Sequence, residues 1–247
     1  MSEASAGWRP VPRARTYQLV VDQVEEQILA GTLRVGDRLP GERELASRLQ
    51  VSRPAVREAI RTLEAQGVVR AGVGSGPEAG TVVSALPSEA LTRLLRVHVA
   101  LANFPLDDVV EARVILERAS AALAASEGTP ARLGALAAPL GTMATDEAAD
   151  RHRYNDLDTD FHIAVAEAGG NRLFADMTIA IREAMRLPIL RDLEQLDDSV
   201  WTAAREELTG QHRAIHDAIT AGDGDRAAEL MEEHIRSSRR LLSPESA

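Results

Sequence analysis

The spacing of apolar residues predicts three short helices at the start of the chain. The first keeps apolar residues at intervals of three and four and stops at Gly31, and the second spans 42–49. Ser52 is a good cap for the third helix. The buried stripe of that helix consists of Val56, Ile60 and Leu63. The second and third helices, joined by a tight turn, predict a helix-turn-helix.

A hairpin is predicted directly after the third helix. Two short strands, at 68–70 and 81–83, enclose a glycine-rich tip. The tip contains Gly74 and Gly76, where a backbone without side chains can approach DNA closely. A helix, a helix-turn-helix and a hairpin together predict a winged helix.

From residue 89 onward the apolar pattern is helical and shows no convincing strand. The candidate helices are 89–102, 106–126, 130–147, 150–168, 171–187, 199–221 and 223–242. The breaks between them fall at Pro105, Gly128-Thr129-Pro130, Gly169-Gly170, Pro188 and Gly222-Asp223-Gly224. The expected fold class is therefore mainly α: an N-terminal winged helix-turn-helix plus a C-terminal antiparallel all-α bundle of about six or seven helices.

The charge distribution agrees with a division of the chain into parts. We expect a flexible arm at 1–14, a DNA-binding winged helix at 15–84, a linker at 85–88 and a helical domain at 89–247. The net charge is −10, yet residues 1–80 contain 11 arginines against 10 acidic residues, so the surplus acid lies in the later part. The N-terminal part is free to present a basic face to DNA.

Composition also excludes several classes of protein. The absence of cysteine excludes disulfides and thiolate metal sites. Aromatic residues make up only 3%, which favours packed helices over a β-sandwich. The N-terminus lacks an apolar signal region and no apolar run approaches the length of a bilayer span, so we expect a cytoplasmic location and no membrane partner.

The third helix carries the residue pattern of a DNA-recognition helix. Arg53 and Arg57 are four residues apart, on the face opposite the apolar stripe. The planar guanidinium of arginine can engage guanine O6 and N7 together, which suits it to reading base edges. Arg43, at the start of the preceding helix, is placed for a phosphate or an adjacent base. Isolated arginines are more often solvated surface charges, so this interpretation depends on the whole winged-helix pattern.

Four residues of the helical domain predict a metal site. Asp158 and His162 are four apart and share one face of a helix, while His212 and His234 lie on the apolar sides of two later helices. Each histidine alone is explained as a core residue with a hydrogen-bond partner, but three imidazoles and a carboxylate satisfy one another best through a metal. Zinc is expected first, with nickel or manganese as alternatives. His216 is a rival ligand, interpreted as a surface residue because it lies off the apolar stripe.

The segment LPGERELASRLQVSRPAVREAIRTLEAQGVV resembles the signature of the GntR family of bacterial regulators. The resemblance implies that Arg43, Ser52, Arg53 and Arg57 occupy DNA-contacting positions, and that the wing glycines Gly74 and Gly76 reach the minor groove. Two departures stand out. Gly41 replaces the usual serine, which weakens the cap of the second helix, and the wing is long and acidic, with Glu78 in place of a basic residue.

The helical domain resembles the FCD effector domain of the FadR-type GntR subfamily. The segments that carry this resemblance are EARVILE (111–117), DLDTDFHIAV, GGNRLF, HRAIHDAITAGD and MEEH. The resemblance implies that Asp158, His162, His212 and His234 match the metal-ligand positions of metal-containing members. It implies further that Arg113 helps to hold the carboxylate of an organic-acid effector. The alternative for Arg113 is an ordinary helix salt bridge with Glu117.

These features together predict a transcription regulator rather than an enzyme. We expect a homodimeric repressor that binds an inverted-repeat operator in double-stranded DNA and responds to a small organic acid bound at a metal. Three alternatives stay open: a sensor of the metal ion itself, a helical-bundle metalloenzyme, and a metal that only stabilises the fold. The effector acid, the operator sequence and the regulated genes do not follow from the sequence.

Overall fold

The structure is a computed structural model that describes residues 15–72, 80–84 and 88–242. Backbone packing divides the chain into two units, Met1–Ala90 and Leu91–Ala247. Within the described ranges, none of the helices combines the length and the apolar character that a membrane crossing requires.

Several sequence-based expectations concern segments outside the described residues. These are the arm at 1–14, the wing glycines Gly74 and Gly76, the acidic Glu78 and residues 85–87 of the expected linker. They stay predictions.

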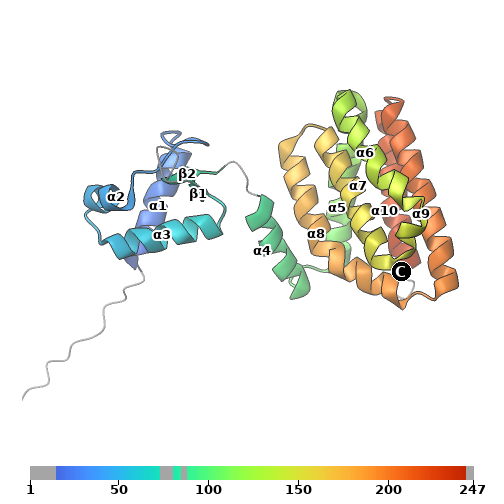
Figure 1. Ribbon diagram of the computed structural model, residues 1–247, viewed down its shortest axis with the longest axis horizontal. Helices are drawn as coiled ribbons and strands as arrows, with labels where there is room; N and C mark the ends of the chain where they lie inside the picture. The colour runs from blue at the N-terminus through green and yellow to red at the C-terminus, as the bar shows by residue number, and fades with distance from the viewer. Residues whose placement is uncertain (1–14, 73–79, 85–87, 243–247) are drawn as a thin grey trace, which may run out of the picture. The chain divides into compact units, whose positions relative to one another are not determined.

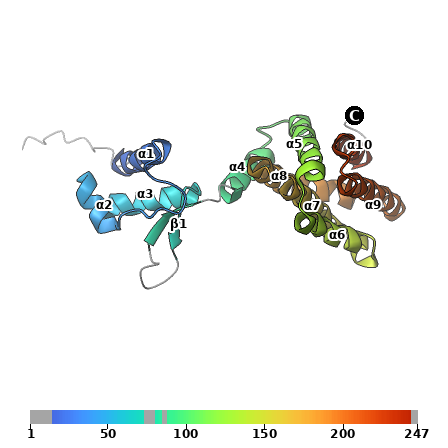
Figure 2. The ribbon, with the colours of Figure 1, turned by 90° about the horizontal axis from the view of Figure 1, so that it is seen from above.

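The first unit contains three helices and a two-stranded hairpin. The bounds are Arg15–Leu29 for α1, Glu42–Leu49 for α2, Arg53–Ala65 for α3, Val69–Gly72 for β1 and Gly80–Val83 for β2. The two strands pair antiparallel, with Val69 opposite Val83 (Figure 2). The helix-turn-helix and hairpin that the apolar pattern predicts are therefore present, with bounds close to those expected.

Local backbone geometry sets the turns of the helix-turn-helix. Gln50 ends α2 in the left-handed region, at φ 53°, and its N–H reaches back to the last turn of that helix. The Ser52 hydroxyl caps α3 by accepting the N–H of Ala55 at 3.3 Å. Gly41 precedes α2 without a side-chain cap, as its replacement of serine leads us to expect.

The core of the first unit fixes the orientation of α3. Its buried side packs against α1 and β1, where Val21, Ala59 and Leu63 have no exposed surface. A second apolar group, Leu45, Ala46, Val56 and Ile60, joins α2 to α3. Because one side of α3 is held in this way, its opposite side is presented to the outside at a defined angle.

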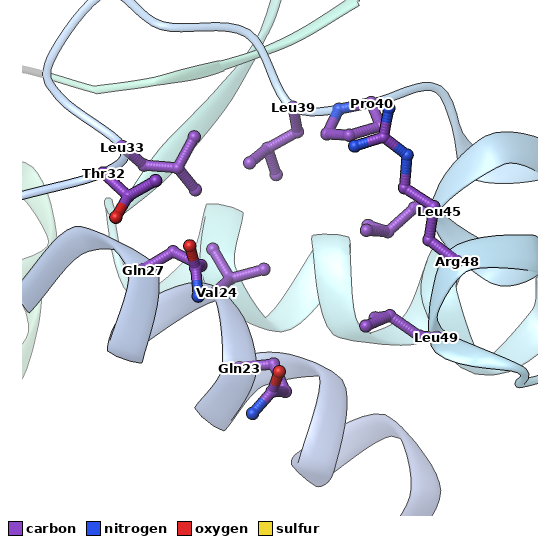
Figure 3. A pocket seen from close by; sticks show the side chains of 10 residues that line it. All are labelled: Gln23, Val24, Gln27, Thr32, Leu33, Leu39, Pro40, Leu45, Arg48 and Leu49. Carbon is purple, nitrogen blue, oxygen red and sulfur yellow. The ribbon is translucent and has the colours of Figure 1, made fainter. Parts of the chain in front are cut away.

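A pocket of about 290 Å³ lies in the first unit, between α1, the segment 32–40 and α2. Val24, Leu45 and Leu49 point into it, with Arg48 at its edge (Figure 3). The lining is mainly apolar, and the guanidinium of Arg48 pairs with Glu44 at 2.5 Å.

The second unit is helical throughout its described part. The boundary between the units falls within α4, Ser88–Ala100. The elements after it are α5 Leu106–Glu127, α6 Pro130–Met143, the 3-10 turn Asp146–Ala149, α7 Arg151–Ala168, α8 Arg172–Gln195, α9 Asp198–Thr220 and α10 Gly224–Leu242. The long helices pack side by side, with α7 between α6 and α8, and α5 against α10 (Figures 1 and 2). The fold class is thus the expected one: mainly α, with a winged helix-turn-helix followed by a helical bundle.

Two expected helix ends in the bundle are wrong. The helix predicted to run to residue 147 ends at Met143, and a short 3-10 turn follows. The break predicted at Pro188 does not occur, because α8 continues through the proline to Gln195. The turns beyond Pro188 are held by tertiary packing, since Leu190 and Leu193 are buried there. The side chain of Asn155 on α7 also donates to the carbonyl of Arg186 at 2.9 Å.

Candidate metal centre and nucleic-acid interface

All four residues expected to bind a metal meet at one place in the bundle. Asp158 and His162 come from α7, His212 from α9 and His234 from α10, and all four are buried. One donor atom from each lies within 4.8 Å of the other three. Nε2 of His162 lies 3.2 Å from Nε2 of His234 and 3.3 Å from Nε2 of His212. Oδ1 of Asp158 lies 3.2 Å from Nε2 of His212.

The atoms around Nδ1 of His162 and of His234 indicate which ring nitrogen of each histidine carries the hydrogen. Nδ1 of His162 is 2.5 Å from Oε2 of Glu117, and Nδ1 of His234 is 2.9 Å from Oε1 of Gln211. The amide nitrogen of Gln211 donates to Glu207 at 3.0 Å, so its oxygen is the atom that faces His234. Both Nδ1 atoms therefore face acceptor oxygens, which favours the tautomer with hydrogen on Nδ1 and a lone pair on Nε2.

The two imidazoles are also neutral. Burial, with a further contribution from Arg182, lowers the pKa of His162 to about 4. Burial and the neighbouring His212 and His162 hold the pKa of His234 well below its ordinary value. Two nitrogen lone pairs thus lie 3.2 Å apart with no hydrogen between them, and Nε2 of His212 and Oδ1 of Asp158 lie beside them. A cation at their centre would satisfy all of them, so the residues present fit a metal ion.

A second layer of buried charges surrounds the four ligands. Arg182 on α8 donates from Nε and Nη2 to Glu117, at 3.0 and 2.7 Å, and from Nη1 to Oδ2 of Asp158 at 2.9 Å. Arg113, one turn before Glu117 on α5, donates from Nε to Oε1 at 3.1 Å. Only 1% of Arg182 and 2% of Glu117 is exposed. The salt bridge that was the alternative for Arg113 exists, but it is one member of a larger buried network.

The arginines keep both carboxylates ionised. Burial raises the pKa of Glu117, but Arg182, His162 and Arg113 outweigh it, and the pKa lies well below the ordinary value. Burial likewise raises the pKa of Asp158, but Arg182 and the neighbouring histidines lower it by more, so this pKa also lies well below the ordinary value. The charges of Arg113 and Arg182 thus balance those of Glu117 and Asp158. A bound divalent cation would give the centre a net positive charge, which an anionic ligand could offset.

The recognition helix presents its arginines away from the core. Arg53 and Arg57 are exposed, one turn apart on α3, and Arg43 is exposed in the first turn of α2. Nε of Arg57 lies 3.6 Å from the carboxylate of Glu42. Among the described residues, neither Arg43 nor Arg53 has an ion-pair partner, which leaves both available to phosphates or bases.

Sequence reasoning missed three residues of the polar centre. The sequence indicates Glu117 only as a salt-bridge partner of Arg113, and no motif points to Arg182 or Gln211. A signal for Arg182 was present, because it lies between the buried Thr178 and Met185, at helical spacing on the inward side of α8. A charged residue at such a position needs a buried partner, and here it has two.

The other histidines lie apart from the centre. His152 is exposed and pairs with Glu194 at 3.2 Å. His216, the rival ligand, is half-buried, with Nδ1 3.3 Å from its neighbour Asp217. The structure therefore groups His212, not His216, with the other donors.

A winged helix with exposed arginines on its recognition helix, in one chain with a helical bundle, defines a DNA-binding transcription regulator. Family models agree: "Bacterial regulatory proteins, gntR family" matches residues 16–78, and the "FCD domain" matches residues 108–237. The chain belongs to the GntR family and, within it, to the FadR-type regulators that carry an FCD domain.

Characterised relatives cover nearly the whole chain. The HTH-type transcriptional repressor NanR of Cronobacter sakazakii is 29% identical over 240 residues, which are 94% of this chain and 87% of the relative. The HTH-type transcriptional regulator LutR of Bacillus subtilis is 29% identical over 217 residues, 86% of this chain and 94% of the relative. Both relatives are transcription regulators and not enzymes.

Solved structures share the architecture. A Streptococcus agalactiae GntR protein is 27% identical and superimposes with a TM-score of 0.58, covering 91% of this chain and 99% of that chain. Escherichia coli McbR/YncC, at 20% identity and a TM-score of 0.51 over 94% of this chain and 99% of that chain, shares the fold.

Proposed function

We propose that the protein is a homodimeric repressor whose operator affinity is controlled by a small carboxylate metabolite, bound beside a divalent transition metal. Asp158, His162, His212 and His234 would hold the metal, and Arg113 would pair with the carboxylate of the metabolite. Zinc is the first candidate for the metal, with nickel or manganese as alternatives.

One observation carries the metal part of this proposal: lone pairs of His162 and His234 meet the carboxylate of Asp158 in a buried space. Three imidazole nitrogens and one carboxylate oxygen suit zinc, nickel or manganese better than calcium, which prefers oxygen ligands. A bound metal would supply a localised positive charge that favours the carboxylate oxygen of a ligand.

The surroundings of Arg113 support an anionic effector. Arg113 is only 6% exposed, and the one hydrogen bond described for it uses Nε. Its two terminal nitrogens are therefore available for a planar carboxylate, and the partly desolvated setting strengthens such a contact.

The DNA half of the proposal rests on α3. Arg53 and Arg57 would read base edges in the major groove, Arg43 and Ser52 would contact the backbone, and the wing would approach the minor groove through Gly74 and Gly76. Two copies would read the two halves of an inverted repeat. A relative named as a repressor, NanR, favours repression over activation.

Operator binding of the full-length protein tests the proposal. The operator is first selected from random DNA by the protein itself, and its affinity is then measured by fluorescence anisotropy for chelator-stripped and zinc-reloaded protein. We expect at least one acid from a panel of mono-, di- and tricarboxylates to change operator affinity by about 5- to 150-fold, only in the zinc-loaded protein. Arg113→Ala should lose that response and keep its zinc.

The same titrations separate the rival functions. An operator affinity that changes with zinc alone, without any response to the acids, would identify a metal sensor. Chemical conversion of an acid by the loaded protein would identify an enzyme. Equal responses with and without zinc would remove the metal from the mechanism, and elemental analysis showing no bound metal after reloading would remove the metal site itself.

A further inference from the structure

One carboxylate, that of Glu117, is shared between the two halves of the proposed site. Its Oε2 lies 2.5 Å from Nδ1 of His162, a proposed metal ligand. Its Oε1 accepts the Nε hydrogen of Arg113, the proposed effector residue, at 3.1 Å. Glu117 is therefore in direct contact with a residue from each half, and it is buried.

Arg182 holds Glu117 in place independently of Arg113. It donates to both carboxylate oxygens, at 3.0 and 2.7 Å, and its remaining contact goes to Asp158. If Arg113 moved away, Glu117 would keep its position but lose one of the positive partners that neutralise it.

The charge left on Glu117 affects His162 as a ligand. A carboxylate that accepts the Nδ1 hydrogen of a metal-binding histidine makes the opposite nitrogen, Nε2, more basic and fixes the orientation of the ring. An arginine that donates to the same carboxylate makes Nε2 less basic again, because it competes for the same negative charge.

We propose that Glu117 couples the effector to the metal: an anion that draws Arg113 away from Glu117 strengthens His162 as a metal ligand. Anion and metal then bind with positive cooperativity, and the coupling is reciprocal. This inference rests on the proposed function above and deepens it by naming the residue through which the two ligands act on each other.

Cobalt binding tests the coupling without knowledge of the effector. Co²⁺ affinity and the visible absorption spectrum are measured for the wild type, Arg113→Met, Glu117→Gln and the double variant. Arg113→Met mimics withdrawal of the arginine and should raise Co²⁺ affinity by roughly fivefold, the low end of ordinary coupling between sites. Glu117→Gln should lower it by about 10- to 100-fold and alter the spectrum, because His162 loses its anchor.

The double variant separates coupling through Glu117 from a simple loss of positive charge. In the Glu117→Gln background, Arg113→Met should change Co²⁺ affinity by less than about twofold. An increase of the same size in both backgrounds, or no increase in the wild type, would overturn the inference.

Control variants and a folding check complete the experiment. Arg118→Met removes an arginine from the same helix that pairs with Glu232 instead, and it should leave Co²⁺ affinity unchanged; an increase matching that of Arg113→Met would also overturn the coupling. Circular dichroism identifies variants that remain folded. A wild type that binds no Co²⁺ would overturn the metal centre itself, whereas binding with additive variants would overturn only the coupling.

Discussion

Replacing Arg182 by methionine should remove a large part of the stability of the helical unit. The guanidinium makes three charge-assisted hydrogen bonds to Glu117 and Asp158, at 2.7 to 3.0 Å, and only 1% of the residue is exposed. Methionine fills similar space but leaves two buried carboxylates without their main partner. Breaking a buried ion pair in this way costs about 3–5 kcal/mol, against a total of roughly 5–15 kcal/mol for an ordinary domain.

Trp201 provides the assay. It is 4% exposed, lies edge-on to Tyr154 at 5.2 Å, and donates from Nε1 to the carbonyl of Ala149 at 2.9 Å. The chain has two tryptophans, so a Trp8→Phe background makes fluorescence report the helical unit alone. Urea unfolding of the metal-free protein then gives the free energy difference between Arg182→Met and its parent.

Two further variants determine whether the loss comes from the unpaired carboxylates. Arg186→Met, one turn along α8, removes a half-exposed arginine paired with Asp156 and Glu183, and should cost less than about 1 kcal/mol. Adding Glu117→Gln to Arg182→Met should recover part of the loss, because one of the two carboxylates is then neutral. A loss below about 1 kcal/mol for Arg182→Met would refute the reasoning.

Helix α3 and the candidate metal centre each give further expected outcomes. Arg53→Ala should weaken operator binding by about 1–3 kcal/mol. Arg61 pairs with Glu58, so Arg61→Ala should have a smaller effect. Equal losses of affinity for the two variants in a salt series would contradict the recognition-helix assignment. His234→Ala should lower metal content in elemental analysis while His152→Ala retains it, and full occupancy in the former would remove His234 from the ligand set. Chelation should lower the unfolding temperature of the helical unit, since the metal binds only the folded state; an unchanged melting curve would argue against a bound metal.

The helix-turn-helix could be predicted because local rules determine it. The cap at Ser52 and the apolar stripe on α3 depend only on residues close in sequence. The grouping of Asp158 with three histidines could also be predicted, because each histidine lies on an apolar helix face that must point inward. Glycines and prolines predict most of the helix ends, because they act on the backbone of the residues next to them.

The second layer of charges could not be predicted, because no local rule joins its members. Glu117 and Arg182 are 65 residues apart, and their pairing depends on how α5 and α8 pack. The continuation of α8 through Pro188 has the same origin, since contacts with α7 outweigh the local preference of proline to end a helix. Tertiary packing decided both features.

The order of the helices along the chain also bears on how the protein is made. His234 lies on α10, the final described helix, which packs against α5, where Glu117 lies. Among the described elements, the winged helix leaves the ribosome before α10, and domains generally fold as they emerge. The winged helix of a nascent chain can therefore fold before all four proposed metal ligands have left the ribosome, and the interval between the two events is the time needed to translate the bundle.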